Sequence, residues 1–217
     1  EYRGCTSNFT VMDKYGNVIS QTQTIRNWWG SGVVIPGRGF IMNNAMADFS
    51  AKAGVRTTQG LAYGMANAIR PGKTPLSSMS PTIVMKEGKP VLSVGAAGGP
   101  RIITSTLQLI INNLDYGMMM DSAVKHPHMC CLTLNQGLEL EEGFSPDTIK
   151  LLAAKGHIIK NTTDFGELLV MPNGIRNIDG TFFPGGTSRV DGGGGALTAS
   201  GTMAIDGLCF IDEKLTK

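Results

Sequence analysis

The sequence has 217 residues, enough for one sizeable hydrophobic core, and it is most simply interpreted as a single domain or as one part of a larger assembly. With 19 Lys and Arg against 17 Asp and Glu, it lacks the charge excess that would favour nucleic acid or an anionic membrane surface. Its longest apolar runs are far shorter than the roughly 20 residues that span a bilayer, so we expect a soluble chain, and no signal peptide is visible.

The first third of the chain is predicted to form strands joined by tight turns. Alternating polar and apolar residues indicate strands over 8–12, 18–25, 32–35 and 40–43, with turns at "KYGN", "WWGSG" and "IPGRG". Residues 51–74 are rich in glycine and only weakly periodic. Their length is typical of a functional loop rather than a simple connection.

The middle of the chain changes from strands to helices. Strands are predicted over 82–86 and 91–94, with "KEGK" as their turn. A glycine-rich turn then leads into a segment over 101–114 whose apolar residues have helical spacing. The turn therefore places backbone amides at the N-terminus of a predicted helix. Further helices are expected over 120–125 and from an N-cap at Ser145 to Lys155.

The last part returns to strands, one over 167–171 and one near the end of the chain. The segment "VDGGGGALTASG" at 190–201 is low in complexity, and we expect a flexible or close-packed tail there. Strands followed by helices and again by strands, without a sustained βαβ alternation, predict an α+β domain.

The four cysteines do not form a metal-binding pattern. Cys5, Cys130, Cys131 and Cys209 have neither CxxC spacing nor Cys/His spacing suited to zinc. We therefore expect no metal and no other cofactor. The 29 glycines, by contrast, indicate many tight turns or places where the backbone closely approaches another group.

A few polar residues and glycines could carry chemistry. They are Thr6 and Thr24, Asp48, Ser77 and Ser78, and Gly98 and Gly99. Taken singly, each has a structural explanation, because threonine is common at strand starts, Asp and Ser cap turns, and glycine permits tight turns.

Several longer stretches together are more specific. They are "VMDKYGNVIS", "MNNAMADFSAKAGV", "RPGKTPLSSMSPTIVMKEGKP", "GAAGGPRIITSTLQLIINNLDYG" and "LEEGFSPDTIKLLAAKGH". From Cys5 to about Thr198 the chain resembles the small, catalytic subunit of the γ-glutamyltranspeptidases, which are N-terminal nucleophile hydrolases. The pair "PLSSMSPT" and "GGxRI", about 20 residues apart, is the most specific part of the resemblance.

The resemblance implies a threonine nucleophile. Thr6 matches the residue that becomes the N-terminus of the small subunit when the precursor cleaves itself, and its free amine then acts as the base, so that no histidine is needed. Thr24 matches a second threonine that hydrogen-bonds the nucleophile. Gly98 and Gly99 match the backbone amides of the oxyanion hole.

The resemblance also implies a substrate pocket. Ser77 and Ser78 match the pair that binds the α-carboxylate of the glutamyl group, and Asp48 matches the carboxylate that holds its α-ammonium. The segment 51–74 falls where the family has a loop over the pocket.

Three positions depart from the family pattern. Arg26 stands where the family usually has an Asn that contacts the glutamyl group, and Ala45 stands where a Gln or Glu usually binds the α-ammonium together with Asp48. Ala47 replaces an Asp that commonly precedes Asp48. A guanidinium favours carboxylates and disfavours ammonium groups. One interpretation is an acyl donor that lacks the α-amine or carries extra negative charge, and the other is that Arg26 pairs with Asp48 while the site still accepts glutathione-like donors.

The family fold is a four-layer αββα sandwich, and by resemblance this chain supplies about half of it. A large subunit from the same precursor would supply the rest, and residues 6–217 would form the small-subunit domain. Five residues precede Thr6, which leaves three interpretations: a piece of an uncleaved precursor, a chain boundary drawn upstream of the cleavage site, or a homologue that does not cleave itself. A cut before Cys5 is a fourth.

The implied function is cleavage of the γ-glutamyl amide of glutathione-like donors through an acyl-enzyme, with transfer to water, an amino acid or a peptide. Alternatives are a cephalosporin-acylase-like or γ-polyglutamate-processing amidohydrolase of the same family, and an inactive homologue that acts as a binding subunit. The resemblance also implies a periplasmic or extracellular location.

Overall fold

The structure is a computed structural model, and it describes residues 4–52, 54–55, 64–132, 137–163, 170–189, 194–197 and 203–206. The strands are β1 Gly4–Met12, β2 Val18–Asn27, β3 Thr82–Lys86, β4 Lys89–Ala97, β5 Met129–Cys130, β6 Leu138–Glu141, β7 Ile159–Thr163, β8 Met171–Ile178, β9 Thr181–Gly186, β10 Gly194–Leu197 and β11 Met203–Asp206. The α-helices are α1 Ile102–Leu114, α2 Met120–Lys125 and α3 Pro146–Ala154, and the 3-10 helices are η1 Ala45–Asp48, η2 Met65–Asn67 and η3 Gly99–Arg101.

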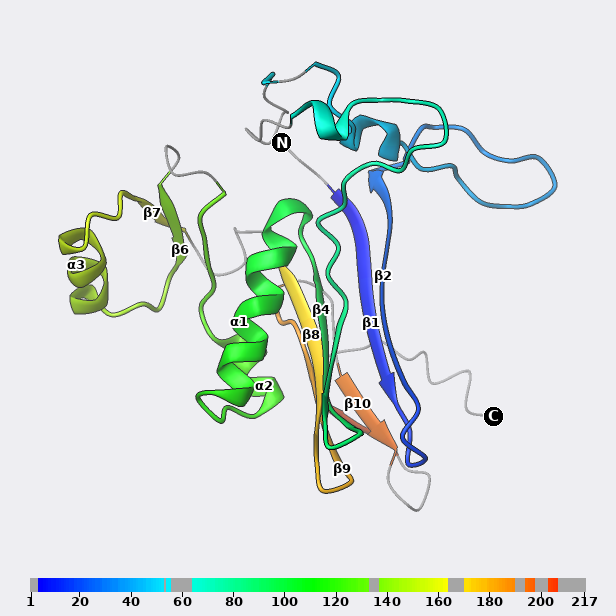
Figure 1. Cartoon of the computed structure of the whole chain (residues 1–217). Coiled ribbons are helices and arrows are strands. Elements are labelled where there is room, and N and C mark those ends of the chain that lie inside the picture. The colour runs from blue at the N-terminus through cyan, green and yellow to red at the C-terminus, as the bar shows by residue number, and fades with distance from the viewer. Residues whose placement is uncertain are drawn as a thin grey trace.

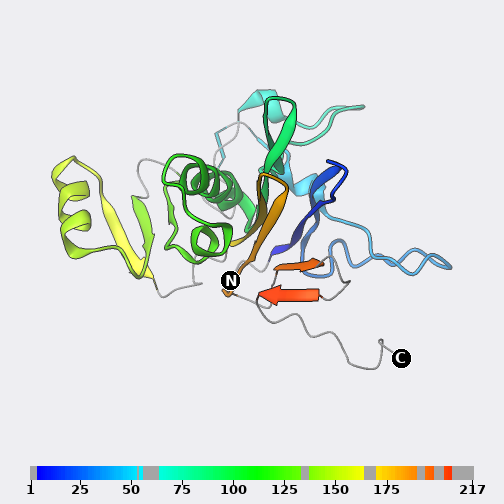
Figure 2. The same cartoon turned by 90° about the horizontal axis from the view of Figure 1, so that it is seen from below.

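The main body is layered (Figures 1 and 2). Its centre is an antiparallel sheet in the order β3-β4-β8-β9. Helices α1 and α2 cover one face of this sheet, and the antiparallel hairpin of β1 and β2 covers the other. A smaller sheet, β5-β6-β7, lies with α3 beyond α1, and β10 pairs with β11. The predicted α+β class is confirmed.

Strand β4 is covered on both faces, and its side chains divide by size. Leu92 and Val94 belong to the hydrophobic core with Leu109 of α1 and Met120 of α2. Ser93 and Gly95 are small and contact the hairpin, Ser93 through a hydrogen bond to the Ile19 carbonyl and Gly95 through direct packing against the side chain of Asn8. Small residues on this face let the hairpin lie close to the sheet.

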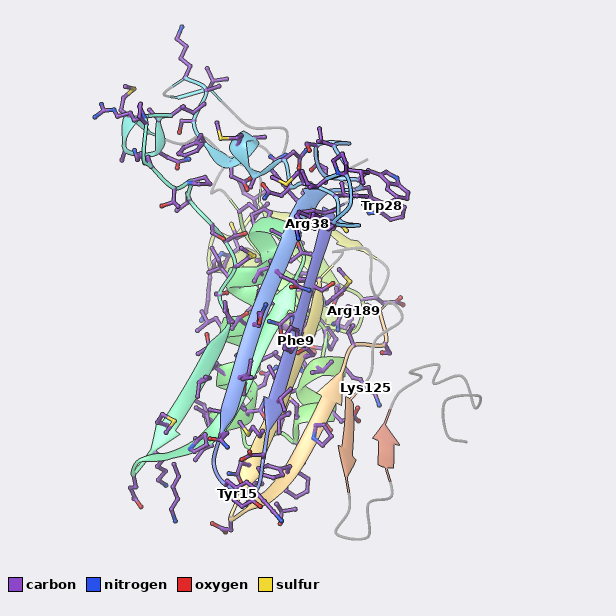
Figure 3. The ribbon with its side chains drawn as sticks, turned by 90° about the vertical axis from the view of Figure 1, so that its right-hand side faces the viewer. Phe9, Tyr15, Trp28, Arg38, Lys125 and Arg189 are labelled. Atoms are coloured by element: carbon purple, nitrogen blue, oxygen red, sulfur yellow. The ribbon has the colours of Figure 1, made fainter. Side chains whose placement is uncertain are left out.

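A buried ion pair joins α2 to the strands around it. Arg189, labelled in Figure 3, and Glu141 are both fully buried at their side chains. Arg189 also donates to the carbonyl oxygens of Val124 (2.7 Å) and His126 (3.0 Å), so it satisfies the open end of α2. Burial alone raises the pKa of Glu141, but hydrogen bonds from Arg189 and from the His128 amide hold it below its ordinary value.

Most of the predicted elements are present, with some differences. Helix α3 begins after Ser145, whose Oγ accepts a hydrogen bond from the Thr148 amide at 3.1 Å, as the sequence predicts. Residues 32–35 and 40–43 are not strands, because glycines at positive φ bend the backbone there and only one bridge, Val34 to Ile41, joins them. Part of the predicted tail at 190–201 is strand β10.

Two other expectations fall partly outside the described residues. Most of the predicted strand at 167–171 lies there, and β8 begins at Met171. The loop expected over 51–74 is described only in part, and its last portion contains η2. Within the described part of the chain, no helix combines the length and the apolar character needed to cross a membrane.

Candidate active site

The two threonines named from the sequence meet at the amino end of β1. Thr6 Oγ1 and Thr24 Oγ1 are 2.9 Å apart, on paired strands. Thr24 Oγ1 also donates to the carbonyl oxygen of Cys5 at 2.9 Å and accepts from the Arg26 amide at 2.8 Å. Because a threonine hydroxyl has only one hydrogen, a bond from Thr24 to Cys5 makes Thr6 the donor within the threonine pair.

The strand pairing is irregular at this point. Cys5 pairs with Arg26 and Thr6 pairs with Thr24, so Ile25 of β2 stands between the two pairs without a partner strand residue. This is a β-bulge, which bends a strand and re-aims its side chains. The carbonyl of Ile25 instead accepts from the Asn44 amide at 3.2 Å, which holds η1 beside the end of β2.

The bulge brings Arg26 to Asp48. Arg26 has a φ of 74°, in the left-handed region that side chains other than glycine and asparagine seldom adopt. Its Nε donates to Asp48 Oδ1 at 2.7 Å, and two longer bonds reach Asn27 Oδ1 at 3.3 Å and the Ala47 carbonyl at 3.4 Å. Thr6, Thr24, Arg26 and Asp48 are therefore linked by one run of hydrogen bonds.

The glycine pair and the serine pair form a second group. Gly98 and Gly99 have φ values of 141° and 61°, which a residue with a Cβ could adopt only with strain, and they lead into η3 and α1. Ser78 Oγ donates to the Gly99 carbonyl at 2.8 Å, whereas Ser77 Oγ accepts from the Met79 amide at 3.1 Å. The serine segment is thus attached to the glycine turn.

Both groups lie at the same end of the layered body. The amino end of β1 and the carboxyl end of β4 are at the top of Figure 1, and β4 runs directly into the Gly98–Gly99 turn. The contact of Asn8 with Gly95 fixes how the hairpin lies on β4. Asn8 follows Thr6 by two residues on β1, and Gly95 precedes Ala97 by two residues on β4. No hydrogen bond joins the two groups among the described residues.

One side chain beside the site was not assigned a role from the sequence. Arg101, the last residue of η3, donates through Nε (3.1 Å) and Nη2 (2.9 Å) to Glu139 Oε2 on β6, and Lys160 of β7 donates to Oε1 at 2.8 Å. Burial raises the pKa of Glu139, but the bond from Lys160 and the charge of Arg101 hold it below its ordinary value. The arginine of "GGPRI" could have indicated this ion pair, but its partner Glu139 is far along the chain, and no local pattern connects the two.

The histidines have other surroundings. His128 is buried, His126 lies edge-on to Phe144, and His157 is exposed. None of them hydrogen-bonds to the threonine or glycine groups within the described ranges. In the same ranges, no cluster of three or more His, Cys, Asp or Glu side chains could hold a metal ion.

Comparison with known proteins gives a consistent family. The family model of Gamma-glutamyltranspeptidase matches residues 1–192. The glutathione hydrolase proenzyme of Escherichia coli is 45% identical over 172 residues, which are 78% of this chain and 30% of that protein. The acylase ACY 1 proenzyme of a Pseudomonas species is 36% identical over 207 residues, 94% of this chain and 34% of that protein.

A solved structure agrees with these relatives. A mutant γ-glutamyltranspeptidase of Helicobacter pylori superposes with a TM-score of 0.76 at 39% identity, covering 85% of this chain and 100% of that one. The structural neighbours thus have the N-terminal nucleophile hydrolase fold, and the chain spans 30% of the length of the E. coli relative. This chain belongs to the γ-glutamyltranspeptidase family.

Proposed function

We propose that this chain is the small, catalytic part of a self-cleaving enzyme that hydrolyses or transfers γ-glutamyl groups, with Thr6 as its nucleophile. The observation that carries the proposal is the hydrogen-bond network at the strand bulge. Thr6 and Thr24 are 2.9 Å apart there, and Thr24 donates to the Cys5 carbonyl, which is the acyl group of the peptide bond before Thr6.

This arrangement supports self-cleavage before Thr6. Thr6 Oγ1 attacks the Cys5 carbonyl carbon, and the bond between this carbon and the Thr6 nitrogen breaks. The Thr6 nitrogen takes up the proton that the Thr6 hydroxyl loses. Water then hydrolyses the resulting ester, which leaves a carboxylate on Cys5 and a free amine on Thr6. The hydrogen bond from Thr24 withdraws charge from the Cys5 carbonyl oxygen, which supports attack at this peptide bond.

Removal of the Cys5 carbonyl prepares the site for substrate. The hydroxyl hydrogen of Thr24 is then free to bond Thr6 Oγ1, and the new amine of Thr6 is free to accept the hydroxyl proton. Thr6 Oγ1 attacks the γ-carbonyl of the donor, and the amides of the Gly98–Gly99 turn stabilise the oxyanion. The leaving amine takes the proton, and water or an amino group later accepts the acyl group.

Donor recognition is assigned to the side chains beside these groups. Ser77 and Ser78 bind the α-carboxylate of a γ-glutamyl donor such as glutathione, and Asp48 faces its α-ammonium. The attachment of Ser78 to the Gly99 carbonyl supports this assignment, because it fixes the serine segment beside the oxyanion amides. Arg26 pairs with Asp48, the contact expected in the second interpretation above, and we propose that the site accepts glutathione-like donors beside this pair.

The active enzyme also requires a second chain. We assign residues 1–5 to the precursor segment and 6–217 to the small-subunit domain, which forms about half of an αββα sandwich. A large subunit from the same precursor supplies the other half. The apolar side chains on the outer face of β1 and β2, Phe9, Val11 and Ile19, support this proposal, since each is 41% to 53% exposed.

Two measurements on the full-length protein test the proposal. Intact mass spectrometry is expected to find a chain that begins at Thr6, and γ-glutamyl-p-nitroanilide is expected to release nitroaniline. Thr6→Ala should abolish both. A wild-type protein that stays uncleaved and inactive would contradict the proposal and favour a homologue that acts as a binding subunit.

A further inference from the structure

We infer that Arg26 sets the specificity for the acyl donor, by occupying Asp48 so that a donor gains little from an α-amine. The substrate class would then include amides of ω-carboxyacyl groups, such as glutaryl amides, alongside γ-glutamyl compounds. This inference rests on the proposed function, because it concerns donors that acylate Thr6.

The ion pair is well formed and largely shielded. Arg26 Nε lies 2.7 Å from Asp48 Oδ1, and the two side chains are 11% and 35% exposed. Charged hydrogen bonds of this length are among the stronger polar contacts in proteins. Removing Arg26 from Asp48 to admit another cation would therefore be unfavourable.

The backbone of Arg26 is strained in a way that points to function. Its φ of 74° lies in the left-handed region, which asparagine tolerates and which arginine adopts at a conformational penalty. The Arg26 amide is fixed by Thr24, the partner of the nucleophile. A long cationic side chain is thus held against its backbone preference at Arg26, which pairs with Cys5, the residue before Thr6.

The local charge balance gives this cation its effect. Asp48 is the only acid of η1, because Ala45 and Ala47 carry no charge. Arg26 and Asp48 together are neutral, so an incoming ammonium meets a carboxylate whose charge is already compensated and a guanidinium of its own sign. A donor without the amine avoids this repulsion and keeps the carboxylate that Ser77 and Ser78 are proposed to bind.

Two anilides separate the classes of donor. The γ-glutamyl and glutaryl p-nitroanilides have the same leaving group, chain length and terminal carboxylate, and differ only in the α-amine. The experiment measures kcat and KM for both with the cleaved, full-length enzyme. For the wild type we expect the two values of kcat/KM to lie within about tenfold of each other. This ratio is smaller than the discrimination that a good hydrogen bond to the charged α-amine would provide.

Substitutions at the ion pair provide the decisive comparison. Arg26→Asn, whose new residue tolerates the left-handed backbone, should shift the preference toward the γ-glutamyl anilide by about tenfold or more, mainly through KM, because the ammonium contact is made before and during reaction. Arg26→Lys should keep the wild-type ratio. Adding Asp48→Asn to Arg26→Asn should remove the gained preference for the γ-glutamyl anilide. Comparison of the double variant with the two single variants measures the coupling between the two positions.

Each outcome separates this inference from the proposed function. A wild-type preference of more than about 100-fold for the γ-glutamyl anilide, or a ratio that Arg26→Asn leaves unchanged, would overturn the inference while the enzyme stays active. If neither anilide is cleaved although the chain is cut at Thr6, the proposed γ-glutamyl chemistry itself fails. Cleavage at Thr6, read by mass, also shows that each variant has folded.

Discussion

At the scale of single residues, Thr24 is the centre of the hydrogen-bond network around Thr6. Its hydroxyl contacts Thr6 Oγ1, the Cys5 carbonyl and the Arg26 amide. Cleavage already removes the Cys5 carbonyl, and Thr24→Ala removes the two remaining contacts, so we expect kcat of the cleaved enzyme to fall by about 100-fold, similar to the loss of a hydrogen-bond donor at a reacting centre. Thr24→Ser keeps the hydroxyl and should stay within about tenfold of the wild type.

Steady-state hydrolysis of γ-glutamyl-p-nitroanilide by the cleaved enzyme measures this effect. The serine variant is the matched control, because it differs from the alanine variant by the hydroxyl alone. Equal losses in both variants would mean that the methyl group of Thr24, and not its hydroxyl, is what the site requires.

His128 gives the stability of the protein a pH dependence. Burial first, and with it the charge of Arg189, lowers the pKa of His128 to about 3. Its unfolded value is the ordinary 6.5, so between pH 6.5 and about 3 the unfolded state binds the proton and the folded state does not. Stability is therefore expected to fall as the pH drops below 6.5, by at most about 1.4 kcal/mol per pH unit from this group.

Urea unfolding of the full-length protein between pH 7 and pH 4.5 tests this dependence. Neither ring nitrogen of His128 has a hydrogen-bond partner among the residues described, so His128→Leu should leave stability at pH 7 nearly unchanged and flatten the slope. His157→Leu, at an exposed position, is the control and should keep the wild-type slope. A His128→Leu protein with an unaltered slope would show that other groups cause the acid sensitivity.

The sequence predicted which side chains gather at the site better than how they are joined. The resemblance to the γ-glutamyltranspeptidases singled out Thr6, Thr24, Gly98 and Gly99, and their catalytic roles stay predictions. The contact of Thr24 with the Cys5 carbonyl could not be predicted, because it depends on a bulge that leaves Ile25 unpaired. The Arg26–Asp48 pair belonged to one of two interpretations, and it is present, with Arg26 Nε 2.7 Å from Asp48 Oδ1.

At the scale of elements, the position of the hairpin on the sheet depends on the contact between β1 and β4. A Cβ added to Gly95 would lie 2.6 Å from Asn8 Cγ and 2.7 Å from Oδ1. Asn8 cannot easily move away, because its Nδ2 donates to Thr22 Oγ1 at 2.7 Å. Gly95→Ala is therefore expected to destabilise the protein by about 1–3 kcal/mol, the usual effect of overpacking.

Calorimetric melting of the full-length protein measures this effect as a lower Tm. In an Asn8→Ala background the same substitution should be much less harmful, because the obstructing side chain is absent. Gly64→Ala is the control, since a Cβ there meets no atom within 4 Å and its φ of −83° suits any residue. A loss of Tm that is equal in both backgrounds would assign the effect to another neighbour of Gly95.

Elements with strong local signals were predicted, and those without were missed. The apolar period of α1 and the Ser145 cap of α3 are local properties, and both helices begin near the expected residues. Strands β5 and β6 are short and gain their stability from distant partners, so no local pattern indicates them. The glycine-rich segment between β2 and η1 alternates like a strand, but its backbone turns at Gly30, Gly32, Gly37 and Gly39.

At the scale of the whole molecule, the layers are unequally covered. The central sheet has helices on one side and the hairpin on the other, but nothing described covers the outer face of the hairpin, where Phe9 is labelled in Figure 3. Val11 and Ile19 pair directly across the strands on this face, and they are 50% and 53% exposed. Adjacent exposed apolar side chains of this kind are typical of a surface that another chain covers.

This outer face yields a prediction about assembly. Ile19→Lys places a charge where the proposed large subunit packs, so the two chains should separate after cleavage, because burying an unpaired ammonium is strongly unfavourable. Size-exclusion chromatography with detection of both chains measures the fraction that stays associated. Leu151→Lys is the control, because Leu151 is 64% exposed on α3, at the opposite side of the molecule in Figure 1. If the cleaved chains of Ile19→Lys stay together as firmly as those of the control, the second chain does not cover this face, and the half-sandwich proposal must place it elsewhere.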